Sequence, residues 1–181
     1  MRLAGDRLTA GVRALATLDA SWCVQLNRGM EIRPLGRALQ IASRLGDGVF
    51  WYVLMAAMLA TRGAAALPAV LHMAAVGALG ILAYKWLKKR TSRPRPYQVQ
   101  QAIRVGAAPL DAFSFPSGHT LHATGFSIVA TSYYPELAWL VVPFSLLVAL
   151  SRPVLGLHYP SDVLAGALIG ASIAGASLWI A

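Results

Sequence analysis

The chain has 181 residues, of which 57% are hydrophobic and only 13% charged, and its mean hydropathy is +0.57, which excludes an ordinary soluble globular domain. Its formal charge of +9 indicates an anionic partner, either a lipid or a substrate, and nucleic acid is not expected because the cations form no stripe interleaved with aromatic residues. The single cysteine, Cys23, excludes an internal disulfide and a cysteine-based metal cluster.

Residues 1–40 precede the most apolar part of the chain. Apolar residues such as Leu8, Leu15 and Leu26 recur there at roughly helical spacing, but charged residues interrupt them repeatedly. This pattern predicts an amphipathic helical segment that lies at the membrane interface, with a membrane span as the alternative. We therefore separate it from the membrane domain expected over residues 41–181.

Five apolar stretches follow and are expected to cross the membrane. Residues 64–84 and 163–181 carry no formal charge and are each long enough to span ~30 Å of hydrocarbon. Residues 118–134 and 137–150 are separated by a Pro-Glu pair, which predicts a helical hairpin. Residues 49–60 reach spanning length only when extended backwards. The fold class expected is therefore all-α, a polytopic membrane bundle of about five helices, with a sixth at the N-terminus as the alternative.

The last apolar stretch carries a row of small residues at four-residue spacing: Gly166, Gly170 and Ala174. Small side chains allow two membrane helices to approach closely. We expect this row to pack tightly against a neighbouring helix.

Three polar patches interrupt the apolar stretches, at residues 85–96, 116–119 and 151–162. No run of spanning length separates the first patch from the second, and the predicted hairpin crosses the membrane twice before the third. All three patches should therefore reach the same face of the membrane. We expect them to form one site.

The first patch contains Lys88 and Arg95, the latter directly before a proline. An Arg-Pro pair favours an extended or turn conformation, from which the planar guanidinium can bind phosphate oxygens. The neighbouring cations Lys85, Lys89 and Arg90 are equally well explained as anchors of a helix end.

The second patch, Pro-Ser-Gly-His, precedes an apolar helix. Ser117 is suited to the N-cap, Gly118 allows an anion to approach the backbone, and the unpaired N–H groups of the first helical turn favour a negative charge. His119 then lies in that first turn and faces the same volume.

The third patch combines Arg152 with His158 and Asp162. His158 should lie just before the last helix and Asp162 in its first turn, close enough for a carboxylate–imidazole hydrogen bond. Such a bond would set the tautomer and leave the other ring nitrogen as a nucleophile. The alternative for Asp162 is an acid that only complements the helix dipole. Two further histidines, His72 and His122, receive no role.

Together the patches resemble the type 2 phosphatidic acid phosphatase family, whose pattern is Lys-x6-Arg-Pro, then Pro-Ser-Gly-His, then Ser-Arg-x5-His-x3-Asp. Every position of that pattern is present here. The resemblance implies that His158 attacks phosphorus, that Asp162 orients it and that His119 protonates the leaving oxygen. The residues that would bind the phosphoryl group are Lys88, Arg95, Ser117, Gly118 and Arg152. It implies neither a metal nor another cofactor.

The function expected is therefore hydrolysis of the terminal phosphate of a membrane lipid, such as undecaprenyl diphosphate, phosphatidylglycerophosphate or phosphatidate. The alternatives are a lipid A phosphatase, a lipid phosphotransferase with the same phosphohistidine, a vanadate-dependent haloperoxidase-like enzyme, and a non-catalytic lipid-binding scaffold. The resemblance implies a bacterial inner membrane with the site facing the periplasm or exterior, although the basic patch by itself would favour the cytoplasm. The sequence assigns no oligomeric state.

Overall fold

The computed structural model describes the backbone of residues 2–180 and the side chains of residues 15–180, and this part of the chain contains helices and no strand. The predicted all-α class is confirmed. The helices are α1 (Arg2–Asn27), α2 (Arg33–Arg44), α3 (Phe50–Arg62), α4 (Leu67–Thr91), the short α5 (Pro96–Val99), α6 (Gly118–Tyr133), α7 (Ala138–Val154) and α8 (Pro160–Ile180).

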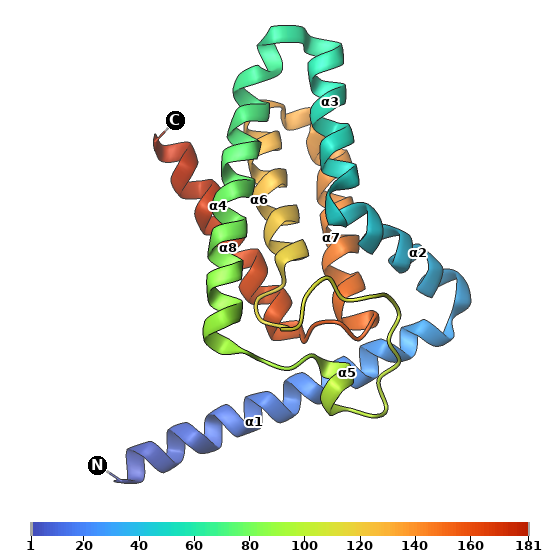
Figure 1. Cartoon of the computed structure of the whole chain (residues 1–181), viewed down its shortest axis with the longest axis vertical. Helices are drawn as coiled ribbons and strands as arrows, with labels where there is room; N and C mark the ends of the chain where they lie inside the picture. Colours follow the sequence, from blue (N-terminus) through green and yellow to red (C-terminus); the bar gives the residue numbers. More distant parts are fainter. Residues whose placement is uncertain (1, 181) are drawn as a thin grey trace.

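Helices α3, α4, α6, α7 and α8 form a bundle (Figure 1). A tight turn at Gly63–Ala66 joins α3 to α4, and another at Pro135–Leu137 joins α6 to α7, as expected from the Pro-Glu pair. Both turns lie at the same end of the bundle. The opposite end, called here the site end, therefore gathers the connection 92–117, the connection 155–159 and the junction between α2 and α3.

Helix α8 packs closely against α6 through the predicted row of small residues. A Cβ atom on Gly166 would lie 2.4 Å from the carbonyl oxygen of Ser117, and one on Gly170 would lie 2.2 Å from that of Leu121. Ala174 is also buried on this face. The predicted close approach is confirmed, and it places the first turn of α6 directly beside the first turn of α8.

The bundle core is apolar and rich in aromatic rings. Trp51 is fully buried and contacts Phe50, Phe126 and Phe144, with ring centroids 4.9–5.7 Å apart. Because these rings come from α3, α6 and α7, they pack three helices together around one centre inside the bundle.

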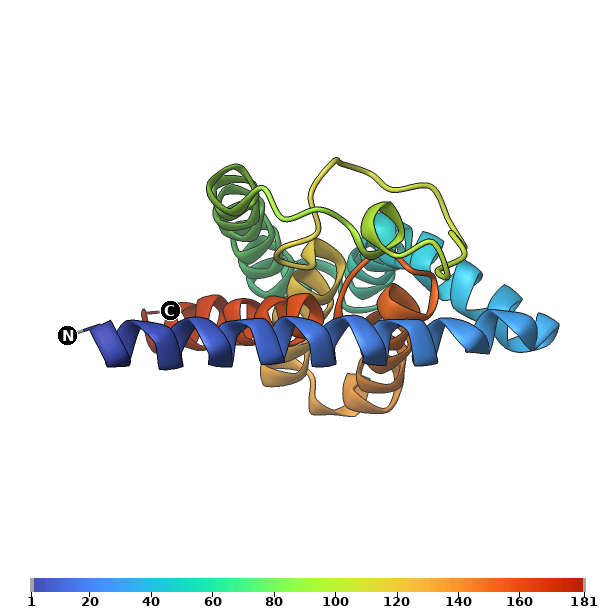
Figure 2. The same cartoon turned by 90° about the horizontal axis from the view of Figure 1, so that it is seen from below.

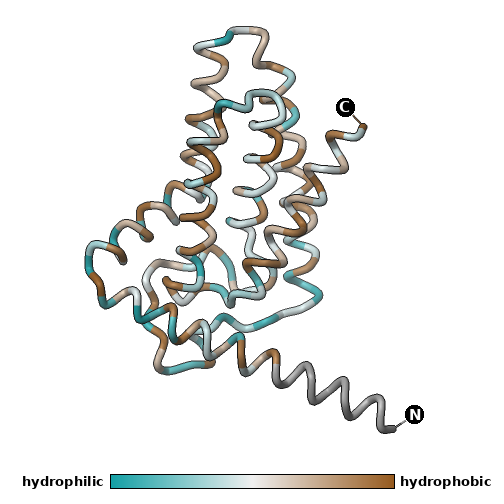
Figure 3. The backbone as a smooth tube through the Cα atoms, turned by 180° about the vertical axis from the view of Figure 1, so that it is seen from behind, coloured by the Kyte–Doolittle hydropathy of each residue, from teal (hydrophilic) through white to brown (hydrophobic). Residues whose placement is uncertain are grey.

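Three stretches of the described chain are long and apolar enough to cross a membrane: Arg33–Val99, Pro135–Val154 and Pro160–Ile180. The first contains both α3 and α4, and α6 is shorter, with 16 residues. The bundle helices are mostly hydrophobic, whereas the connection after α4 is hydrophilic (Figure 3). Large apolar side chains such as Trp139 and Trp179 point outward, 89% and 93% exposed. The count of five spans stays a prediction.

Helix α1 lies across the site end of the bundle and contacts α7 and α8 (Figure 2). Its described residues Leu15 and Trp22 are exposed, whereas Asn27 is buried and hydrogen-bonded to backbone atoms of Val154 and Arg104. The side chain of Leu8 lies outside the described residues. The interfacial position of this helix stays a prediction. The proposed boundary between residues 40 and 41 falls inside α2, which packs on α7.

Candidate active site

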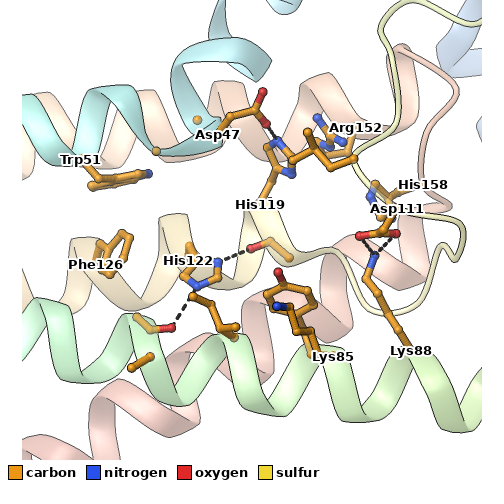
Figure 4. Close-up of a pocket in the computed structure, with 18 of the residues that line it drawn as sticks. Asp47, Trp51, Lys85, Lys88, Asp111, His119, His122, Phe126, Arg152 and His158 are labelled. Carbon is orange, nitrogen blue, oxygen red and sulfur yellow. Dashed lines mark hydrogen bonds and ion pairs between the residues drawn. The ribbon is translucent and has the colours of Figure 1, made fainter.

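A cavity of about 890 Å³ opens at the site end and extends between α3, α4 and α6 (Figure 4). Six of the predicted site residues line it: Lys88, Arg95, Gly118, His119, Arg152 and His158. The other two, Ser117 and Asp162, are buried behind its wall. The three polar patches therefore meet at one cavity at the site end.

The first patch forms two buried cationic positions around one carboxylate. Lys88 Nζ lies 2.7 and 2.8 Å from the two carboxylate oxygens of Asp111 and donates to the carbonyl of Phe113. Arg95 donates to the same carboxylate at 2.8 Å and to the carbonyl of Leu157 at 2.8 Å. Both cations are thus held rigidly and aimed at the cavity, as buried charges require.

Asp111 lies in the connection before α6 and was not singled out from the sequence. Burial alone would raise the pKa of its carboxyl, but hydrogen bonds and charge from Lys88 and Arg95 hold that pKa below its ordinary value. The residue belongs to no helix and no motif, so only its contacts identify it.

The second patch starts α6 as predicted. The Ser117 hydroxyl caps the helix by accepting from the N–H of Thr120, and the Ser117 N–H donates to the backbone carbonyl of Asp162 at 3.0 Å. Gly118 lines the cavity, where a Cβ atom would meet only Tyr84 at 3.6 Å. The helix start is therefore tied to the third patch and presents its backbone to the cavity.

Arg152 is buried at the end of α7. One of its terminal nitrogens donates to the hydroxyl of Ser43, while its Nε has no hydrogen-bond partner. A buried donor without a partner is costly, and it lies beside a cavity whose walls are already cationic. The arrangement suits an anion that accepts from Arg152 when it binds.

His158 differs from the prediction in its orienting contact. Its Nδ1 is 2.6 Å from the carbonyl oxygen of Ser114 and 3.7 Å from the nearest oxygen of Asp162, which is too long for a hydrogen bond. The expected carboxylate–imidazole hydrogen bond is therefore wrong for this structure. Asp162 instead accepts from the N–H of Tyr159 at 2.8 Å and from Arg93 at 2.7 Å, which turns its oxygens away from the ring.

The contact with Ser114 still has the chemical effect that was expected from Asp162. A carbonyl only accepts, so Nδ1 carries the proton and Nε2 keeps its lone pair. Nε2 lies 3.4 Å from Arg95 and faces the cavity. Burial lowers the pKa of His158 well below its ordinary value, and the charges of Arg152, Arg95 and Lys88 lower it further. The ring is neutral at pH 7, as a nucleophile requires.

The histidines without a predicted role also have partners. His122 lines the cavity, with Nδ1 2.9 Å from the carbonyl oxygen of Gly118 and Nε2 3.2 Å from that of Gly77, and these oxygens can only accept a hydrogen bond from the ring. His72 contacts Tyr133 and Ser177 farther from the site end. Among the described residues, no three His, Cys, Asp or Glu side chains group as metal ligands.

The family model of the PAP2 superfamily matches residues 65–181. Decaprenylphosphoryl-5-phosphoribose phosphatase of Mycolicibacterium smegmatis is 40% identical over 114 residues, which are 60% of this chain and 60% of the relative. Undecaprenyl-diphosphatase BcrC of Bacillus subtilis is 35% identical over 106 residues, 59% of this chain and 54% of the relative. The matches thus span little more than half the length of these relatives.

A solved structure shares the fold. The crystal structure of a transmembrane PAP2-type phosphatidylglycerolphosphate phosphatase from Bacillus subtilis superposes with a TM-score of 0.73 at 23% identity, over 92% of this chain and 86% of that chain. Together with the apolar helices, this fold shows an integral membrane protein. The matched family model covers all three polar patches from Lys88 to Asp162, and the chain belongs to the PAP2 superfamily.

Proposed function

We propose that the protein is a membrane phosphatase that hydrolyses the terminal phosphate of a lipid phosphate or diphosphate through a phosphohistidine on His158. One observation carries the proposal. The buried His158 presents an unprotonated Nε2 to the same cavity as the cations Lys88, Arg95 and Arg152, one of which has an unpaired buried donor.

The reaction has two steps. In the first, His158 Nε2 forms a bond to phosphorus while the bond to the lipid oxygen breaks, and the departing oxygen takes a proton from His119. In the second, water gives a proton to His119 and attacks phosphorus, and the P–N electron pair returns to Nε2. Inorganic phosphate and the dephosphorylated lipid leave, and both histidines regain their starting protonation.

The cations stabilise the charge that spreads over the phosphoryl oxygens during transfer. Lys88 and Arg95 are held by Asp111, and Arg152 by Ser43, so these groups need little reorganisation when the phosphate binds. The backbone N–H of Gly118 at the start of α6 supplies a further donor.

Asp162 has a different part in this scheme from the one expected. It holds the backbone N–H of the residue after His158, and its own carbonyl accepts from Ser117. It therefore acts as a positioning residue that keeps the nucleophile and the start of α6 in register, together with Arg93.

The substrate class follows from the walls of the cavity. Its far part is apolar and lined by Met55, Ile81 and Phe126, which suits a hydrocarbon chain next to a phosphate. Two relatives carry names of prenyl phosphate substrates, which favours a polyprenyl diphosphate or phosphate. Phosphatidylglycerophosphate, phosphatidate and the lipid A phosphate are the other candidates.

We also propose a location in a bacterial inner membrane with the site end facing the periplasm or exterior. The support is the resemblance to the family. The test places a cysteine at the exposed Leu110 and treats intact cells with a membrane-impermeant maleimide. We expect this cysteine to react. Protection of the cysteine until the cells are lysed would place the site in the cytoplasm.

The test of function uses the purified full chain in detergent. Phosphate release is measured from undecaprenyl diphosphate, phosphatidylglycerophosphate and phosphatidate, with wild type, His158→Ala and the control Glu136→Gln, whose carboxylate pairs with Arg62 near the opposite end. We expect release by wild type and control and none by His158→Ala. A phosphotransferase would move the phosphate to a second lipid without release, and full cellular function of His158→Ala would favour a scaffold.

A further inference from the structure

A carboxylate that belongs to none of the three patches lies at the wall of the cavity. Asp47 is part of the sequence Gly-Asp-Gly, where a π-helical turn joins α2 to α3. Gly48 has a φ of 134°, which favours glycine, and a Cβ atom on Gly46 would lie 2.9 Å from Val148 of α7. The two glycines let the junction bend closely against α7, and this bend brings Asp47 to the site end.

Asp47 is hydrogen-bonded to the catalytic-site imidazole of the second patch. Its Oδ1 contacts His119 Nε2, so the contact joins the α2–α3 junction to the first turn of α6. The His119 side chain is only 9% exposed. In Figure 4 Asp47 points at the His119 ring from the α3 side of the cavity, across from Lys88 on α4.

Other charged and titratable groups around His119 disfavour a positive charge on its ring. Arg152 faces it from α7, His122 lies one turn later on α6, and His158 approaches from the connection before α8. A proton donor must carry that charge before it gives up its proton. Among the groups the structure describes around the ring, the Asp47 carboxylate offsets the repulsion.

We propose that Asp47 is the positioning residue of His119, holding Nε2–H so that Nδ1–H is the proton given to the departing lipid oxygen. The inference rests on the proposed function and assigns a carboxylate to the proton-transfer half of the reaction. Nδ1–H breaks as the lipid O–H forms, and the neutral ring keeps its Nε2–H bonded to Asp47. Water later returns a proton to Nδ1. In the structure, the site histidine that is hydrogen-bonded to a carboxylate is thus His119, whereas Asp162 lies 3.7 Å from His158, too far for a hydrogen bond.

The experiment compares substrates whose leaving groups differ in their need for a proton. Phosphate release is measured from a prenyl or alkyl phosphate and from an aryl phosphate, 4-nitrophenyl phosphate, with wild type, Asp47→Asn, Asp47→Glu and the control Glu136→Gln. For Asp47→Asn we expect kcat with the alkyl substrate to fall roughly 10- to 100-fold, kcat with the aryl substrate to fall less than about threefold, and KM to change little. Asp47→Glu should restore part of the loss, and the control should equal wild type.

The pH profile supplies a readout that a merely structural role would not move. Loss of the carboxylate disfavours imidazolium, so the basic limb of kcat with the alkyl substrate should move to lower pH in Asp47→Asn. Histidine NMR titration of the labelled protein measures the same change without turnover, with His119→Gln to assign the signal. If Asp47→Asn does not fold, Asp47→Ser is measured in its place.

Equal losses with the alkyl and aryl substrates, an unmoved basic limb, or full activity of Asp47→Asn would each overturn the inference. These results are distinct from a failure of the proposed function. In that case wild type would release phosphate from none of the substrates, and the titration of His119 would still report whether Asp47 acts on the ring.

Discussion

The packing of α8 on α6 leads to a prediction that links stability to activity, for the substitution Gly166→Ala. The added Cβ would lie 2.4 Å from the Ser117 carbonyl oxygen, and such atoms rarely approach within 3.0 Å, so the helices must separate by about 0.6 Å or more. The obstacle is backbone, which has no alternative rotamer. Ser117 also starts α6 and is bonded to the carbonyl of Asp162, so the displacement reaches the site directly.

The magnitude follows from two opposing effects. Overpacking typically costs about 1–3 kcal/mol, and replacement of a helical glycine by alanine returns up to about 1 kcal/mol. The expected net loss is about 1–2 kcal/mol, which corresponds to a fall in Tm of roughly 2–8 °C. A displacement approaching 1 Å between His119 and His158 should also lower kcat roughly 10- to 100-fold.

The matched control lies on the same helix. A Cβ atom on Gly175 would meet nothing within 4 Å, so Gly175→Ala gains helix propensity without a clash. Thermal unfolding in detergent and phosphate release are measured for both variants. Equal Tm and equal kcat for Gly166→Ala and Gly175→Ala would refute the claim that this contact sets the geometry of the site.

Three further predictions concern charge. Asp111→Asn should lower stability at pH 7 by only about 1 kcal/mol, because the Asp111 side chain is 38% exposed and its charge is partly screened. The pKa of Asp111 lies below its ordinary 3.8, so the difference from wild type in chemical denaturation should vanish as the pH falls through that lowered pKa. A difference that does not depend on pH would contradict this prediction. The lowered pKa of His158 keeps the nucleophile unprotonated below pH 6.5, so the acidic limb of kcat/KM that it controls should lie below that pH, and a limb at 6.5 or above would show the ring is not desolvated. EDTA should leave phosphate release unchanged, because Lys88, Arg95 and Arg152 supply the positive charge, and a strict requirement for an added divalent metal would count against the mechanism.

Several features could be read from the sequence because they depend on neighbours along the chain. The capping of α6 by Ser117, the hairpin at Pro135 and the small-residue face of Gly166 and Gly170 are all local patterns, and the structure confirms each of them. The meeting of the three patches at one end also followed, because the number of membrane crossings between them decides which face each one reaches.

The contacts that complete the site could not be predicted in the same way. Asp111 lies in a connection without periodic structure, and Asp47 belongs to a different helix junction, 72 residues away from the histidine it contacts. Ser114 binds His158 through its backbone carbonyl, which every residue type possesses. None of these three has a sequence signal that separates it from an ordinary surface residue or turn.

The sequence by itself determined that this is a membrane bundle whose predicted phosphate-binding cations and two histidines gather at one end, because apolar length and motif spacing act over short stretches of chain. Only the tertiary structure decided which group orients each histidine. Asp162 was the nearest carboxylate along the chain, but Arg93 and the Tyr159 N–H occupy its oxygens, and His158 turned to Ser114 instead. Hydrogen-bond partners are chosen by competition among all groups that the fold brings together, and the spacing of a motif does not predict the outcome of that competition.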